Sequence, residues 1–274
     1  MEIQKSRINL KETIQIVSEP LERSVQTDFY LPIRPVHPET ISLLLINDGQ
    51  DLERMGFQAI LDDLHDQGLI SPLLCVGIHA GVDRKMEYGT SIVTDYKGRG
   101  AKAIQYTQFI FEELLPAIQK KYSIPEFRDK AFAGFSLGAL SALDNVWNHP
   151  REFSKVGVFS GSLWWRTKDK NDISYNDATD RIMHQLIKNG QYHPWLKFFF
   201  ECGGADEGED RNNNGVIDSI DDTLDLIEEL KAKGYRDPEN IHFMLIEDGK
   251  HDIATWARAL PAFLRWGWPG EIFS

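Results

Sequence analysis

Short, continuous apolar runs alternate with helix-forming segments through most of this 274-residue chain. Runs of this kind are typical of strands buried on both faces of a sheet. They occupy residues 42–48, 72–80, 130–136, 155–162, 197–204 and 241–248. Segments with apolar residues at helical spacing lie between most of the runs, and the clearest occupy residues 56–68, 106–122, 221–234 and 253–268. The alternation predicts an α/β fold with a mostly parallel, doubly wound sheet.

The N-terminal part is predicted to add an antiparallel hairpin to this sheet. Residues 12–19 and 23–32 alternate polar and apolar side chains, as half-buried strands do, and three residues connect them. We expect one domain over residues 1–274, because α/β folds of this length often form a single core. Residues 163–194 fall between two predicted strands and contain one amphipathic helix at 177–190, so we expect an insertion over the sheet edge.

Charge and composition exclude several classes of partner. The net charge is −12, so the overall field repels phosphate backbones and anionic lipid surfaces. No stretch reaches the roughly eighteen apolar residues that span a bilayer, and residues 1–15 lack the apolar segment of a signal peptide. Cys75 and Cys202 lie inside apolar runs, which predicts buried free thiols. We expect a cytoplasmic protein without nucleic-acid or membrane partners, and homodimer formation stays open.

Residues 134–138 read Gly-Phe-Ser-Leu-Gly, the pattern GxSxG. The bare pattern is weak evidence, because about one chain in ten of this length carries it by chance at ordinary residue frequencies. Its setting is more specific, since an apolar run ends on Ser136 and a helix-forming segment follows at once. A serine at such an elbow needs glycine on either side, and the helix N-terminus favours negative charge beside its hydroxyl. We predict a nucleophile; a glycine-rich packing turn is the alternative.

A serine hydroxyl becomes a nucleophile only when a base takes its proton and an acid orients that base. In folds with this elbow the acid follows the penultimate strand and the histidine follows the last one. Asp206 follows the run at 197–204, and His251 follows the run at 241–248. The predicted triad is therefore Ser136, Asp206 and His251. Further acids close behind Asp206 remain alternatives, namely Glu207, Glu209 and Asp210.

The oxyanion that forms during attack requires aimed hydrogen-bond donors. We expect the amide of Leu137, directly after the nucleophile, to be one of them. The second is expected from the loop after the run at 42–48, which turns sharply at Gly49 and leaves the Gln50 amide free. A plain Asp-Gly turn without a catalytic role is the alternative for this second donor.

In their order and spacing these segments resemble the esterase D and enterochelin-esterase-like branch of the α/β-hydrolases, which also contains feruloyl esterases and mycolyltransferases. The likeness is carried by residues 17–32, 43–51, 77–89, 106–122, 133–140, 159–165 and 247–266. The resemblance implies the α/β-hydrolase fold and carboxylic-ester hydrolysis, with Ser136 as nucleophile, His251 as base and Asp206 as acid. It also implies an oxyanion hole formed by the amides of Gln50 and Leu137.

The same resemblance suggests substrate-binding side chains. Arg84 and Glu87 match an Arg/Glu pair of the family, which either lines the mouth of the site or forms an ion pair of its own, and we favour the structural role. Trp164 and Trp165 match an aromatic pair near the family's site and are expected to stack on a substrate ring. The alternative is that both indoles only pack the core.

A second motif, at residues 209–222, is similar to a calcium-binding loop. Set against the template D-x-[DN]-x-[DN]-G-x5-E, its ligands would be Asp210, Asn212, Asn214, the carbonyl of Val216, Asp218 and Asp221. Aspartate replaces the usual final glutamate, so the expected affinity for a structural Ca²⁺ is modest. A series of Asx turns leading into a helix is the alternative. An ion here would support the turn that carries Asp206.

Together these features predict a serine esterase that hydrolyses a small soluble carboxylic ester or thioester through an acyl-serine intermediate, with no cofactor for the chemistry. An acyltransferase with the same triad is one alternative. A calcium-stabilised binding protein on a hydrolase scaffold, without turnover, is another. The insertion at 163–194 is expected to cover the active-site face and to shape specificity.

Overall fold

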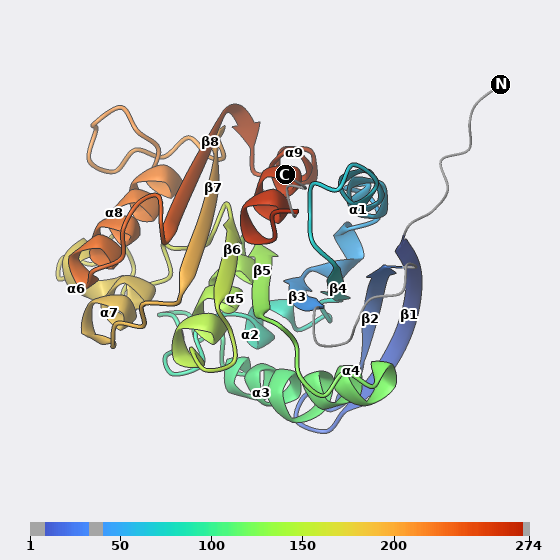
Figure 1. Ribbon diagram of the computed structural model, residues 1–274. Coiled ribbons are helices and arrows are strands. Elements are labelled where there is room, and N and C mark those ends of the chain that lie inside the picture. The colour runs from blue at the N-terminus through green and yellow to red at the C-terminus, as the bar shows by residue number, and fades with distance from the viewer. Residues whose placement is uncertain (1–8, 33–40, 271–274) are drawn as a thin grey trace.

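In the computed structural model, which describes residues 9–32 and 41–270, an eight-stranded sheet forms the centre of the molecule (Figure 1). Its strand order is β1-β2-β4-β3-β5-β6-β7-β8. The strands are β1 (Asn9–Ser18), β2 (Arg23–Pro32), β3 (Ser42–Asn47), β4 (Leu73–Ile78), β5 (Lys130–Phe135), β6 (Lys155–Phe159), β7 (Lys197–Ala205) and β8 (Ile241–Lys250). The hairpin β1–β2 and the pair β2–β4 are antiparallel, and the remaining pairs are parallel. The predicted sheet with its antiparallel start is confirmed. The domain expected over residues 1–274 includes residues 1–8, 33–40 and 271–274, which lie outside the described residues.

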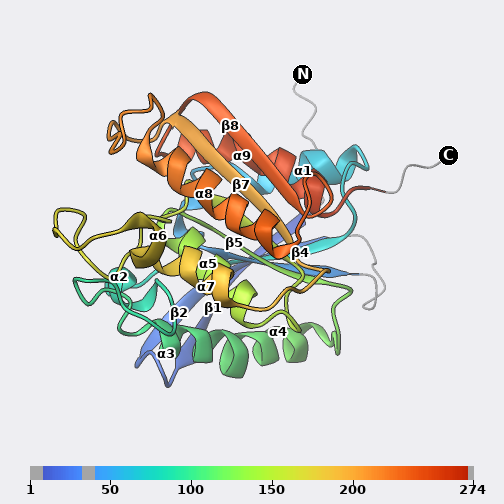
Figure 2. The same ribbon diagram turned by 90° about the vertical axis from the view of Figure 1, so that its left-hand side faces the viewer.

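Helices cover both faces of this sheet (Figures 1 and 2). One face carries α1 (Phe57–Asp66) and α9 (Ile253–Gly267). The opposite face carries the longer set: α3 (Ala103–Gln108), the π-helical η3 (Phe109–Leu114) and α4 (Leu115–Tyr122) as one continuous helix, then α5 (Leu137–Asn148), α7 (Ile182–Asn189) and α8 (Asp218–Lys233). Three short helices complete the described chain, namely η2 (Gly49–Asp51), α2 (Arg84–Glu87) and α6 (Asp177–Asp180).

Two hydrophobic cores result, one on each side of the sheet. Along β3, Leu43 and Leu45 pack into the core beneath α3–α5, whereas Leu44 and Ile46 pack into the core beneath α1 and α9. Each central strand therefore needs apolar residues at every position, which is why the sequence shows unbroken runs. Both cysteines are buried and unpaired, as predicted. Within the described ranges, no helix combines the length and the apolar character that crossing a membrane requires.

The helix predicted at 177–190 is interrupted in the structure. Arg181 has an extended backbone, with φ −77° and ψ 111°, and separates α6 from α7. Its guanidinium donates to Asp222 and to Asp225 of α8, both at 2.8 Å. A buried ion pair with a neighbouring helix thus holds this residue out of helical geometry. Figure 2 shows the resulting arrangement, with α7 beside α8.

Candidate active site

Ser136 lies on a sharp turn between the end of β5 and the start of α5. Its backbone angles, φ 55° and ψ −120°, are strained for a residue with a side chain. Close approach explains the flanking glycines: a Cβ on Gly134 would lie 2.4 Å from the carbonyl oxygen of Gly138, and one on Gly138 would lie 2.6 Å from Asp48 Oδ2. The motif therefore forms the strand-to-helix elbow that its sequence setting predicts.

His251 follows β8 and reaches the serine. Its Nε2 lies 2.9 Å from Ser136 Oγ, and its ring meets Trp256 edge to face with centroids 5.3 Å apart. Burial of the inner side of the ring lowers the pKa of His251 from its ordinary value of 6.5, and the negative charge of Asp206 offsets part of this effect. The imidazole is therefore neutral near pH 7 and can accept the hydroxyl proton.

Asp206 lies on the turn after β7, and its carboxyl group folds back over the strand. A Cβ on Gly203 would lie only 2.5 Å from Asp206 Oδ1. Both carboxyl oxygens are buried, and neither has a hydrogen-bond partner in residues 9–32 or 41–270. Asp206 thus lies near enough to His251 for its charge to offset part of the effect of burial on the His251 pKa, without a direct hydrogen bond between the two.

The other acids considered for the role of Asp206 are exposed to solvent or bind other groups. Glu207 and Glu209 are exposed, and Glu209 forms an ion pair with Lys170. Asp210 accepts hydrogen bonds from two amides of its own loop. Asp252, another acid close to the histidine, caps α9 by accepting from an amide of that helix. Asp206 remains the acid that best fits the predicted role.

The two predicted oxyanion donors keep free amides. Neither Leu137 N–H nor Gln50 N–H donates to another group within the part of the chain that the structure describes. The turn before Gln50 differs from the prediction, because Asp48 and not Gly49 has the left-handed conformation, with φ 61°. Gly49 is required for a different reason: a Cβ there would lie 2.4 Å from the carbonyl carbon of Gly77 on β4.

Arg84 and Glu87 do not pair with each other, so that expectation is wrong. Arg84 binds both carboxyl oxygens of Asp48, with Nε and Nη2 each at 2.7 Å, and its Nη2 also lies 3.4 Å from the carbonyl oxygen of Phe135. Glu87 accepts two hydrogen bonds from Arg23 instead, at 2.7 and 2.6 Å. The two residues lie on one turn of α2, but Arg84 binds the loop after β3 whereas Glu87 binds β2. Arg84 therefore braces the Gln50 loop against the nucleophile elbow, in line with the structural role.

The two tryptophans have different environments. Trp165 is fully buried, at 0 % exposure, so the prediction that it stacks on a substrate is wrong and the packing alternative holds. Trp164 is half-buried and lines a cavity of about 300 Å³ that also receives Glu207, the residue after Asp206. The guanidinium of Arg99 lies 4.9 Å from the Trp164 ring and 5.1 Å from the Trp165 ring. Of the pair, Trp164 alone can offer a ring face to a ligand.

The calcium-like loop is closed by its own hydrogen bonds. Asp210 accepts from the amides of Asn214 and Gly215 at 3.1 and 2.9 Å, and Asp221 accepts from the side-chain amides of Asn212 and Asn214 at 2.8 and 2.9 Å. Within residues 9–32 and 41–270, no three His, Cys, Asp or Glu side chains converge as a metal site would require. This geometry is that of the Asx-turn alternative, and calcium binding stays a prediction.

The remaining positions of the motif are engaged in the same way. The Val216 amide donates to Asn214 Oδ1 at 2.8 Å, and Asp218, the first residue of α8, accepts from the Arg211 amide at 2.7 Å. Arg211 also bonds Asp222 at 2.7 Å, which ties the loop to the helix that it precedes.

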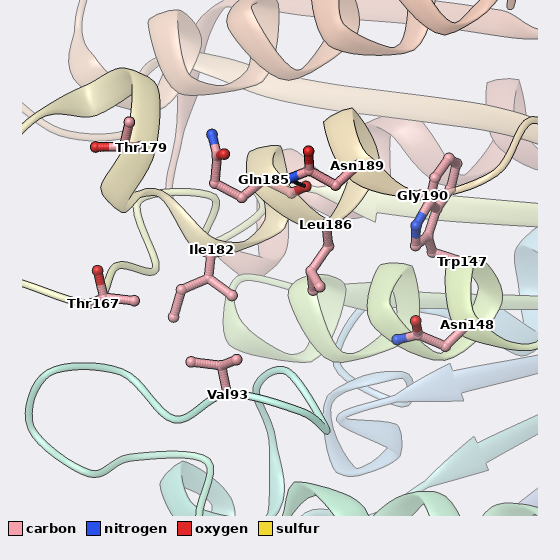
Figure 3. Close-up of a pocket in the computed structure, with 10 residues that line it drawn as sticks. All are labelled: Val93, Trp147, Asn148, Thr167, Thr179, Ile182, Gln185, Leu186, Asn189 and Gly190. Carbon is pink, nitrogen blue, oxygen red and sulfur yellow. Dashed lines mark hydrogen bonds between the residues drawn. The ribbon is translucent and has the colours of Figure 1, made fainter.

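A second cavity, of about 350 Å³, lies between α5, α7 and the loop that carries Val93 (Figure 3). Its walls are mainly apolar and include Trp147 of α5 with Ile182 and Leu186 of α7. None of the predicted site residues lines it. No motif predicts this cavity, because its walls come from separate segments that only the fold brings together.

The order of the strands, the strained serine elbow and the histidine after the last strand define an α/β-hydrolase. A family model described as "Putative esterase" matches residues 18–266. The chain therefore belongs to this esterase family and is a hydrolase. No curated protein matches the sequence.

Solved structures with a similar fold have distant sequences. A ferulic acid esterase superposes with a TM-score of 0.68 at 19 % identity, with 94 % of this chain and 97 % of that chain covered. The enterobactin esterase from Shigella flexneri gives a TM-score of 0.70 at 22 % identity over 96 % of this chain, which spans only 60 % of that longer protein. An IroE-like serine hydrolase from Shewanella oneidensis gives 0.67 at 18 % identity, with coverage of 93 % and 79 %. These likenesses concern the fold.

Proposed function

We propose that this protein is a serine esterase that hydrolyses a small carboxylic ester or thioester through an acyl-serine intermediate. The observation that carries the proposal is the contact of 2.9 Å between His251 Nε2 and the hydroxyl of Ser136 on its strained elbow. A nucleophile and a base within hydrogen-bond distance are the minimum that acyl transfer requires.

The steps follow from the positions of these groups. As Ser136 Oγ attacks the ester carbon, His251 Nε2 takes its proton, and the amides of Leu137 and Gln50 donate to the oxyanion. The imidazolium then gives its proton to the departing alkoxide or thiolate, which leaves the acyl group on Ser136. A water molecule, deprotonated by His251, attacks the acyl-serine and releases the acid. Asp206 stabilises the imidazolium that forms in both halves of the reaction.

The substrate class is supported by the family and by a cavity that Glu207, the residue after Asp206, helps to line. The neighbours named above include esterases of ferulic acid and of enterobactin, which supports an ester as the substrate here. The ring of Trp164 at the nearby cavity favours an ester with a flat or aromatic part. We expect this part to bind along the cavity beside Glu207.

The proposal predicts hydrolysis of p-nitrophenyl acetate and butyrate that depends on Ser136. Ser136→Ala should lower kcat by about a thousandfold or more, because the nucleophile is lost. Release of p-nitrophenol measures the rate, and Ser24→Ala, an exposed serine on β2, serves as the matched control with an unchanged rate. Equal turnover in folded Ser136→Ala and wild type would refute the esterase assignment. Adding an alcohol and measuring the new ester separates hydrolysis from acyl transfer.

A further inference from the structure

Glu201 is a carboxylic acid inside an otherwise apolar strand. It lies on β7 with 0 % exposure. Its Oε2 accepts a hydrogen bond from Ser160 Oγ at 3.4 Å, and Ser160 Oγ in turn accepts from Trp256 Nε1 at 2.9 Å. Oε1 of Glu201 is buried and has no partner among the described residues. Trp256 is also the residue whose ring packs on His251, so this network ends at the catalytic base.

The Asp206 carboxyl group folds back over the face of β7 that carries Glu201. Side chains two residues apart on a strand point the same way, about 7 Å apart, so Glu201 points to the side where a Gly203 side chain would stand. The Asp206 carboxyl group occupies that space, because its Oδ1 lies 2.5 Å from where the Gly203 Cβ would be. The unpartnered oxygens of both groups, Glu201 Oε1 with Asp206 Oδ1 and Oδ2, are thus buried on one side of the strand.

An ionised Glu201 is disfavoured in such a place, because its carboxylate would be desolvated and would lie near the negative charge of Asp206. The neighbouring elements supply little positive charge. The contact directly after β6 is the Ser160 hydroxyl, and on β8 the residue opposite is Met244. From α9, Arg258 contributes a weak attraction, but it is paired with Asp248 at 2.7 Å. These surroundings favour the protonated form of Glu201.

We propose, on the basis of the function proposed above, that Glu201 is a positioning residue: it stands as a protonated acid behind the Asp206 carboxylate and holds that carboxylate toward His251. The Ser160 hydroxyl donates its proton to Oε2 of Glu201. The acidic proton of Glu201 therefore lies on Oε1, the oxygen on the side of Asp206. Burial, with the charge of Asp206, raises the pKa of Glu201 to about 8.

The arrangement makes activity sensitive to alkaline pH. When Glu201 loses its proton, a second negative charge repels Asp206 from its position and the support of His251 weakens. Activity should therefore fall as pH rises through about 8, with kcat affected more than KM. A residue that only filled space would leave the pH profile unchanged.

The test compares pH profiles of p-nitrophenyl butyrate hydrolysis for wild type, Glu201→Gln and Glu201→Leu. Glutamine keeps the shape and can donate a hydrogen bond but cannot ionise, so we expect near wild-type kcat at pH 7 without the alkaline decline. Leucine removes the donor and should lower kcat by up to about a hundredfold. Glu247→Gln, an exposed glutamate on the adjacent strand β8, is the matched control and should keep the wild-type profile.

Two results would overturn the proposal. An alkaline decline that persists in Glu201→Gln would show that another group titrates. A loss of about ten-thousandfold in Glu201→Gln, as expected for removing the acid of a triad, would make Glu201 and not Asp206 the partner of His251.

Melting curves test the protonation separately from turnover. The folded pKa of Glu201 lies above its unfolded value of about 4.5, so between pH 4.5 and 8 the unfolded chain releases a proton that the folded protein keeps. The contribution of Glu201 to the free energy of unfolding therefore falls as pH rises through that window. The Tm advantage of Glu201→Gln over wild type should therefore widen from pH 5 to pH 8, and a constant difference would contradict a protonated Glu201 even if no ester were hydrolysed.

Discussion

At the scale of single residues, several side chains of the site have roles that their motifs did not indicate. Asp48 was expected only as part of a turn, yet it binds Arg84 through both oxygens and takes the left-handed conformation itself. The ion pair therefore ties the loop with the Gln50 amide to Arg84, which also donates to the carbonyl oxygen of Phe135, the residue before Ser136. The signal available in the sequence for Glu201 was an acid within the apolar run at 197–204.

The environment of His251 predicts the acidic limb of the pH profile. The base must be neutral to accept the proton of Ser136, and burial lowers its pKa below 6.5. Activity should rise with pH and reach its plateau through a midpoint below 6.5, measured as kcat/KM for p-nitrophenyl butyrate from pH 4 to 7. Asp206→Asn should move this midpoint further down, because the charge that raises the pKa of His251 is removed. A midpoint above 6.5 in wild type would contradict the assignment of His251 as a desolvated base.

At the scale of elements, β7 and the loop that follows it position the predicted acid, Asp206. β7 carries Glu201 on one face, ends at the turn with Asp206, and continues into the loop that precedes α8. Hydrogen bonds within the loop, together with the ties of Arg211 to α8, fix the start of this helix. The position of the acid thus depends on elements on both sides of it.

The calcium hypothesis for this loop predicts a change in stability. If Ca²⁺ replaces the internal hydrogen bonds of Asp210 and Asp221, calcium at about one hundred times its Kd should stabilise the fold by about 2.7 kcal/mol. Melting curves in calcium and in EDTA measure the shift, which Asp210→Ala combined with Asp221→Ala should abolish. Asp248→Ala, an exposed acid outside the loop, should keep it. A Tm that responds to neither calcium nor EDTA would contradict calcium binding by this loop.

At the scale of the whole molecule, stability comes from the two cores that the sheet separates. The core beneath α9 is rich in aromatic rings, and Phe263 is its centre, with ring centroids 5.5 Å from Phe159, 5.3 Å from Phe199 and 5.7 Å from Trp268. α9 also carries Trp256 against His251, so the same helix closes the core and contacts the candidate site.

Phe263→Ala should therefore destabilise the whole fold. The residue is fully buried, and removing a large aromatic side chain from a packed core costs about 3–5 kcal/mol. Urea unfolding measures the change, with Ile173→Ala, a fully exposed apolar residue, expected to stay within about 0.5 kcal/mol of wild type. A loss below about 1 kcal/mol for Phe263→Ala would show that this core is not tightly packed around it.

The local pattern of the sequence was enough to predict the sheet, its antiparallel start and the order of serine, acid and histidine. Strands buried on both faces need apolar residues at each position, and a nucleophile elbow needs glycines close to the serine. Both features therefore depend only on residues that are near one another in the sequence. The helix at 177–190 was predicted as unbroken because its own residues favour one. The ion pair of Arg181 with α8 that interrupts it joins segments far apart in the chain.

Tertiary structure alone decided which charged groups meet. The resemblance to the family suggested that Arg84 and Glu87 could pair, but the fold places Asp48 beside the first and Arg23 beside the second. It also decided that Trp165 is buried while Trp164 reaches a cavity, and that Glu201 lies behind the acid of the predicted triad. The periodicity of the sequence indicates which face of an element is apolar. It does not indicate which side chain from across the sheet or from a distant loop will contact a given residue, because that contact forms only when the chain packs. The chemistry of this site depends on such contacts.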